Sequence, residues 1–179
     1  MKVGIALNML SEPPRPDVAV VCDHLAMGDL AEPLGFDSLF ALEHHFTGYA
    51  MSPSPTQLLS YYAGRTKRIT FGTAVIVLPW HDPVRVAEQI ALLDIMCGGR
   101  CVFGFGRGAA SIEYEGFRIP MGEARPRFVE AAPRPKPNRQ RPPHMMSKSA
   151  ICSATRTGSC HGRTITAVPS WMRLVRPAK

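Results

Sequence analysis

The segment RITFGTAVIVLPWHDPVRVAEQIALLDIMCGGRCVFGFGRG (68–108) indicates the fold class of this chain. It opens with an apolar, β-branched run at 68–79, which predicts a buried strand. The pair Asp82–Pro83 then supplies an N-cap and a first helical residue, and the pair Gly98–Gly99 ends the helix. A second apolar run at 100–108 ends in a glycine-rich turn. This order of strand, helix and strand is typical of a parallel βαβ unit.

The same alternation extends on both sides of this segment. Apolar runs at 3–9 and 36–43 predict strands, and the segments 16–34, 54–64 and about 122–132 predict helices. In the first helix, apolar residues recur every three or four positions and predict its buried face. They are Val18, Val21, Cys22, Leu25, Leu30 and Leu34. Four such units imply an α/β fold with a parallel sheet, either open and doubly wound or half of an eight-unit barrel.

Residues 1–132 and 133–179 carry opposite net charge. The first part holds 11 Lys and Arg against all 14 Asp and Glu, a net charge of −3. The second part holds ten Lys and Arg, seven prolines and no acid, a net charge of +10. Such a segment buries too little apolar area to offset the entropy of ordering it. We therefore expect a domain boundary at Ala132, followed by an irregular or disordered basic tail.

Two interpretations of this tail stay open. It could be a basic arm for nucleic acid or anionic lipid, but no aromatic stacking pattern accompanies the charge, and we do not expect nucleic acid as a partner. Alternatively, the loss of every acid together with enrichment in Arg, Pro, Ser and Cys is what translation in a shifted reading frame of a GC-rich gene produces. We regard an out-of-frame tail as the stronger hypothesis.

The composition also bears on location and bound metals. No apolar run reaches membrane-spanning length and no cationic leader precedes one, so we expect a cytoplasmic protein without a membrane partner. The five cysteines form no C-x-x-C pair, which argues against a disulfide framework and a zinc ribbon.

Three polar or glycine-rich features follow the predicted strands. Glu43, His44 and His45 end the second strand, the segment 74–79 ends the third, and GFGRG (104–108) ends the fourth. In parallel α/β architectures, ligands and catalytic groups gather at the carboxyl ends of the strands. The sequence therefore predicts one site at this edge.

The adjacent histidines permit several interpretations. Neighbouring residues on a strand point to opposite faces, so His44 and His45 do not readily chelate one ion. No recognised metal spacing links them to Glu43, His81 or Asp82, and we expect no metal. One imidazole could be hydrogen-bonded at the rim for structural reasons. Alternatively, it could transfer a proton, because histidine titrates near neutral pH.

The glycine turn is equally open. GFGRGA differs from the dinucleotide fingerprint because its third glycine comes one position early. Its glycines could permit a tight turn, or they could let a phosphate or a flat ring approach the backbone. In the second case Arg107 would supply a forked donor to the phosphate.

Several motifs together identify a family. EHHF, GRT-x-R-I-x-x-GT, P-x-x-x-AEQIALLD and GR-x-x-FG-x-GRG appear in this order. With the opening MKVGIALNM, they resemble the bacterial luciferase-like flavin-dependent monooxygenases over residues 1–132. The resemblance implies a (β/α)8 TIM barrel, of which this chain carries about the first four βα units. It also implies an enzyme that oxidises an aldehyde or another small organic substrate with reduced FMN and O2, often beside a separate flavin reductase.

The resemblance also implies roles for individual residues. His44 would be the catalytic base or hydrogen-bond partner near the reacting edge of the flavin. Ala74 and Val75 match a strained, sometimes cis, peptide bond beneath the flavin ring, and Arg107 matches a residue near the flavin phosphate. The remaining motif positions are the cofactor-binding Gly106 and the supporting Glu43 and His45.

The resemblance ends where the charge changes. Family members bind the FMN phosphate partly through the second half of the barrel, which 133–179 does not resemble. We therefore expect a truncated chain whose exposed strand edges favour aggregation or a homo- or hetero-oligomer. Two alternative functions stay open. They are an F420-dependent hydride-transferring oxidoreductase, which the EHHF motif disfavours, and a non-catalytic flavin-binding remnant.

Overall fold

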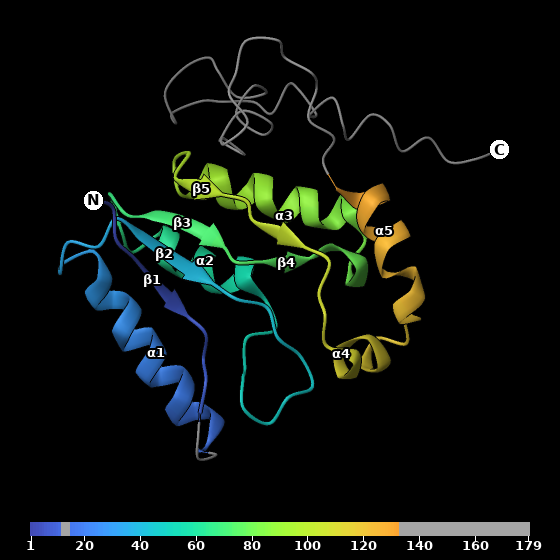
Figure 1. Cartoon of the computed structure of the whole chain (residues 1–179). Helices are drawn as coiled ribbons and strands as arrows, with labels where there is room; N and C mark the ends of the chain where they lie inside the picture. The colour runs from blue at the N-terminus through green and yellow to red at the C-terminus, as the bar shows by residue number, and fades with distance from the viewer. Residues whose placement is uncertain (12–14, 133–179) are drawn as a thin grey trace, which may run out of the picture. The chain divides into compact units, whose positions relative to one another are not determined.

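A computed structural model describes residues 1–11 and 15–132 (Figure 1). Four parallel strands form a sheet in the order β1-β2-β3-β5, and two shorter ones, β4 and β6, form a second parallel pair. The strands are β1 Gly4–Leu7, β2 Ser38–Ala41, β3 Thr70–Thr73, β4 Ile76–Val77, β5 Cys101–Val102 and β6 Phe105–Gly106. The predicted parallel α/β class is confirmed. The predictions for 133–179 concern residues outside this described part.

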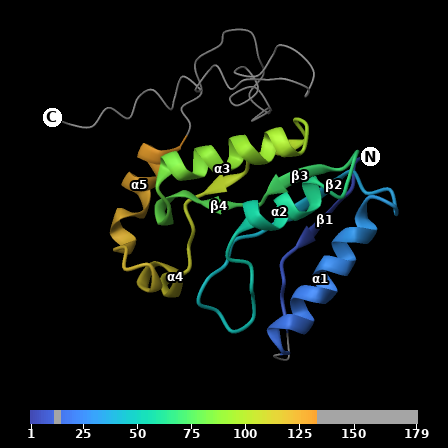
Figure 2. The ribbon, with the colours of Figure 1, turned by 180° about the vertical axis from the view of Figure 1, so that it is seen from behind.

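Helices alternate with these strands. They are α1 Asp17–Ala31, α2 Pro55–Ala63, α3 Pro83–Met96, α4 Ser111–Gly116 and α5 Ala124–Ala131, with 3-10 turns η1 Leu78–Trp80 and η2 Met121–Glu123. Helix α2 lies behind the sheet in Figure 1 and in front of it in Figure 2, so it covers one face. Among helices of the described residues, none is long and apolar enough to cross a membrane.

Proline and a side-chain cap start helix α3 as the sequence predicts. The Asp82 carboxylate accepts hydrogen bonds from the backbone N–H groups of Val84 at 2.9 Å and Arg85 at 3.1 Å. These donors have no partner within the helix, so the cap stabilises its first turn. Past the other end of the helix, Gly98 and Gly99 adopt the left-handed backbone conformation with φ of 66° and 82°.

The core lies between the sheet and the helices. Its sheet side includes Leu7, Leu39 and Phe71, and its helix side includes Leu59, Tyr62 and Leu93. On the opposite face of the sheet, the Phe40 ring lies over two glycines. A Cβ at Gly72 would fall 2.3 Å from that ring, and one at Gly4 would fall 2.9 Å from it. Small residues on the neighbouring strands therefore make room for one large aromatic side chain.

The helix α1 is confirmed, and its predicted buried face is confirmed in part, because Leu25 packs against the core whereas four of the six predicted residues are exposed. Val18, Leu30 and Leu34 are 76%, 55% and 69% exposed, whereas Gly28 and Ala31 are buried. The reason is Tyr62, whose hydroxyl donates to the carbonyl of Leu25 at 2.9 Å. A Cβ at Gly28 would lie 2.3 Å from that hydroxyl oxygen, so close packing selects the face with the smallest residues.

The predicted strands 68–79 and 100–108 are too long. Strand β3 ends at Thr73, a cis peptide bond joins Ala74 to Val75, and β4 is a separate two-residue strand. Between β5 and β6, Thr73 Oγ1 donates to the Gly104 carbonyl at 2.7 Å and accepts from the Gly104 N–H at 2.9 Å. The Gly104 carbonyl also accepts from the Ile76 N–H at 3.0 Å, so Gly104 links the end of β3 to β4 where the sheet divides. Helix α4, which follows the second of these runs, was not predicted.

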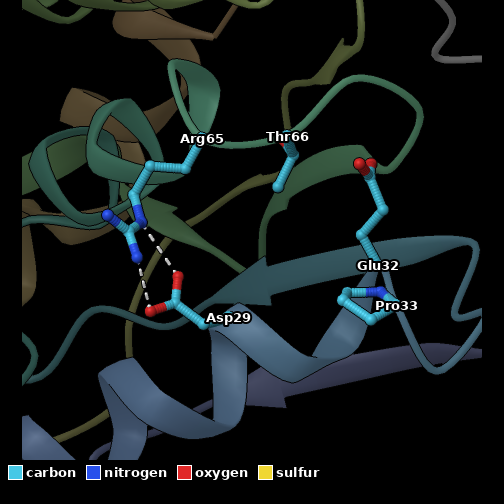
Figure 3. Close-up of a pocket in the computed structure, with 5 residues that line it drawn as sticks. All are labelled: Asp29, Glu32, Pro33, Arg65 and Thr66. Atoms are coloured by element: carbon cyan, nitrogen blue, oxygen red, sulfur yellow. Dashed lines mark hydrogen bonds and ion pairs between the residues drawn. The ribbon is translucent and has the colours of Figure 1, made fainter.

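Polar contacts lie at the amino-terminal end of the strands, before β2 and β3. A pocket there is lined by Asp29, Glu32, Pro33, Arg65 and Thr66 (Figure 3). The Arg65 guanidinium binds both Asp29 oxygens, at 2.9 and 2.7 Å. The Glu32 carboxylate accepts from the backbone N–H groups of 67–69 at 2.7 to 3.2 Å. These groups satisfy one another, which indicates that the pocket is a structural joint between α1 and the segment before β3.

The Glu32 joint predicts a pH-dependent contribution to stability. Burial acts to raise the pKa of Glu32, but the backbone hydrogen bonds outweigh it and hold the pKa below its ordinary value of 4.5. A lowered pKa in the folded state stabilises the fold above the ordinary value, and this contribution is lost as the pH falls through the folded-state pKa. Glu32→Gln should cost about 1 kcal/mol at neutral pH, since solvent screens the charge.

Urea unfolding at neutral and acidic pH measures this effect. The difference between Glu32→Gln and the unchanged protein should shrink below pH 4.5. The matched control is Glu88→Gln, at an exposed position of α3. A loss of equal size at both pH values would contradict the assignment.

Candidate functional site

The segment after β2 and helix α4 lie side by side at the same end of the sheet in Figures 1 and 2. The His44 N–H donates to the Ser52 carbonyl at 3.0 Å, and the Ser52 hydroxyl donates to the Leu42 carbonyl at 2.6 Å. These bonds fold the segment back on itself and fix the backbone that carries the two histidines.

Glu43 is the centre of a buried hydrogen-bond cluster. It is 4% exposed, and its Oε2 accepts from the backbone N–H of Val77 at 2.6 Å. Its Oε1 lies 3.1 Å from Nε2 of His45 and 2.5 Å from Nε2 of His81. One carboxylate therefore ties the end of β2 to β4 and to the residue after η1. His81 was considered in the sequence only as a possible metal ligand.

His45 is surrounded by aromatic side chains and contacts Glu43. Its ring packs edge-on against Phe117, with ring centroids 4.7 Å apart, and against Trp80 at 5.5 Å. With one ring nitrogen on Glu43 and the ring enclosed by aromatic side chains, His45 is positioned as a packing residue. The supporting roles expected for Glu43 and His45 stay predictions.

His44 points to a different partner. Its Nδ1 lies 3.2 Å from Oε1 of Glu113 on α4, and its side chain is 34% exposed whereas that of Glu113 is 3% exposed. The same Oε1 accepts from the N–H of His45 at 2.9 Å. His44 also lines a pocket whose apolar walls include Met9, Phe46 and Met51. A partly exposed imidazole held by a buried carboxylate is suited to proton transfer.

Sequence reasoning missed Glu113. It lies 69 positions after His44. No periodicity in the sequence connects the two, and α4 itself was not predicted. One signal was available. The segment that contains Glu113 follows the glycine turn, and so it comes after the carboxyl end of a predicted strand. Among the described residues, no group of three or more His, Cys, Asp and Glu is arranged to hold a metal ion.

The glycines of the turn allow close packing. A Cβ at Gly106 would lie 2.8 Å from the Val75 side chain, and one at Gly108, where φ is 75°, would lie 2.7 Å from that of Val77. The turn is held to α4 because the Tyr114 hydroxyl donates to the Arg107 carbonyl. The Arg107 side chain is exposed, and so is Ala74 beside the cis peptide bond.

The chemistry of this edge fits a phosphate-bearing ligand with a flat ring. An exposed guanidinium is a forked donor for phosphate. Ala74 is exposed and small, and the Val75 side chain packs over Gly106 beside it. The structure thus brings the predicted residues of the second, third and fourth strand ends to one edge, and it adds Glu113 and His81.

Comparison with known proteins decides the family. A model described as luciferase-like monooxygenase matches residues 1–133. The chain belongs to this family. The alkanal monooxygenase alpha chain of Photorhabdus laumondii is 37% identical over 125 residues, covering 70% of this chain and 35% of that relative. The chain thus spans about a third of the length of the curated relatives it matches.

Solved structures share the fold. The monooxygenase RslO1 from Streptomyces bottropensis has a TM-score of 0.68 at 33% identity, over 73% of this chain and 40% of that one. An FMN complex of 3,6-diketocamphane monooxygenase from Pseudomonas putida has a TM-score of 0.68 at 24% identity, over 73% and 37%. An F420-dependent secondary alcohol dehydrogenase has a TM-score of 0.57 at 23% identity, over 73% and 39%. The luciferase-like chain is therefore a partial TIM barrel.

Proposed function

We propose that residues 1–132 carry the first part of the flavin site of a monooxygenase that uses reduced FMN and O2 to oxidise an aldehyde or another small organic substrate. The observation that carries this proposal is the His44–Glu113 pair, which shares the carboxyl edge of the sheet with the exposed Arg107. The name of the alkanal monooxygenase relative supports an aldehyde substrate. The apolar walls of the pocket beside His44 suit such a molecule.

Each residue of the edge has a place in this proposal. Ala74 and Val75 would hold the flavin ring, and Gly106 and Arg107 its phosphate. When bound, the reduced flavin supplies the electrons that activate O2. His44 would accept or donate a proton beside the reacting edge of the flavin, and Glu43 and His45 would hold the rim in place.

Partners form part of the same proposal. A flavin reductase would supply reduced FMN, as the family resemblance implies. Within the described sheet, β1 and β5 each pair on one side only. Further strands, from a homo- or hetero-oligomeric partner or from a longer chain, would complete the barrel and the phosphate site.

F420 is the alternative cofactor, favoured by the F420-dependent enzyme that shares the fold. Such an enzyme transfers hydride without O2. Parallel titrations of the chain with FMN and with F420 distinguish the two. A preference for F420 would move the proposal to the hydride-transferring class.

The phosphate assignment predicts the behaviour of Arg107→Ala. Removing the guanidinium should weaken FMN binding by about tenfold, which corresponds to one charge-assisted hydrogen-bonding group. Quenching of flavin fluorescence measures the dissociation constant. Arg125→Ala, at an exposed position of α5, is the matched control and should bind FMN normally. Equal affinity of both variants for FMN would refute the assignment.

The proton-transfer assignment predicts that His44→Ala binds FMN but turns over about 10²- to 10⁴-fold more slowly. The assay follows aldehyde-dependent oxidation of reduced FMN in the presence of O2. His24→Ala on α1 is the control, because its imidazole is hydrogen-bonded to the Val20 carbonyl of its own helix. An unchanged rate in His44→Ala would remove His44 from the chemistry. FMN binding without turnover in the unchanged chain would favour the non-catalytic alternative.

A further inference from the structure

We propose that Glu113 is a positioning residue that fixes the proton of neutral His44 on Nδ1 and leaves Nε2 as the proton acceptor of the site. The inference rests on the proposed role of His44 in proton transfer. Its test is spectroscopic and requires neither turnover nor bound flavin, so the two proposals can fail separately.

The hydrogen bonds of Glu113 define the direction of the His44 contact. The Glu113 side chain is 3% exposed, and a carboxyl group this deeply buried needs hydrogen-bonding partners. Oε1 accepts from the His45 N–H at 2.9 Å, and backbone N–H can only donate. The same oxygen lies 3.2 Å from Nδ1 of His44. With Oε1 as the acceptor in both contacts, Nδ1 of His44 carries the hydrogen that points to it.

The neighbouring histidine shows the opposite arrangement. Glu43 contacts His45 through Nε2, at 3.1 Å, whereas Glu113 contacts His44 through Nδ1. Two adjacent histidines are therefore held by two different buried carboxylates through different ring nitrogens. This predicts the Nδ1–H tautomer for His44 and the Nε2–H tautomer for His45. The second histidine is thus an internal reference for the first.

The consequence for the site concerns the free nitrogen of His44. Its backbone is fixed by the bond to the Ser52 carbonyl, and the Glu113 contact fixes Nδ1. Nε2 of the partly exposed ring is then the nitrogen with a lone pair for a molecule in the adjoining pocket. Without Glu113, neutral histidine favours the Nε2–H tautomer, which would present a donor to the pocket in place of an acceptor.

NMR of the imidazole nitrogens tests this inference directly. In ¹⁵N-labelled protein, at a pH where histidines are neutral, long-range correlations distinguish the two tautomers. The His44 signals are assigned by their loss in His44→Ala. We expect Nδ1–H for His44 and Nε2–H for His45 in the unchanged chain. An Nε2–H tautomer of His44 there would overturn the proposal, whether or not any variant folds.

Two substitutions at Glu113 separate positioning from packing. Glu113→Met removes the acceptor and should move His44 to the Nε2–H tautomer, whereas Glu113→Gln keeps an acceptor oxygen and should retain Nδ1–H. Glu115→Met, at an exposed position of the same helix, is the control and should change nothing. Persistence of Nδ1–H in Glu113→Met would overturn the assignment. Correct tautomers without FMN binding would leave the positioning role standing and refute the proposed function.

Discussion

The in-register parallel pairing of β1, β2 and β3 is the constraint on which the rest of the structure depends. Leu7 pairs with Ala41, and Ala41 pairs with Thr73, so the three strands end at the same level. Residues that follow the strands are then brought to the same edge of the sheet. A shift of one residue would turn every side chain of a strand to the other face and separate Glu43 from Val77.

Two buried carboxylates convert this shared edge into a site. Glu43 joins β2, β4 and the residue after η1, and it holds His45 among aromatic side chains. Glu113 reaches the same segment from α4 and holds His44, whose ring stays partly exposed. A buried carboxylate is stable only with its hydrogen bonds satisfied, so each one also fixes the segment that supplies its donors. Both histidines line the pocket, and His44 is the more exposed of the two.

The sequence predicts the elements that depend on local chemistry. Proline and a side-chain cap mark the start of α3, and the alternation of strands and helices gives the parallel sheet. The errors come from contacts between distant residues. The face of α1 depends on its approach to Tyr62, and the division of the sheet after Thr73 depends on the contact of that side chain with Gly104. Glu113 could not be found from spacing, because only the folded chain brings it to His44.

The central proposal is that residues 1–132 carry the first part of a flavin site at the carboxyl edge of the sheet. Titration with FMN, followed by quenching of flavin fluorescence, tests it most directly when the whole chain is compared with a version ending at Ala132. The account predicts saturable binding of similar affinity in both. Absence of binding in both, with the sheet intact by circular dichroism, would contradict it.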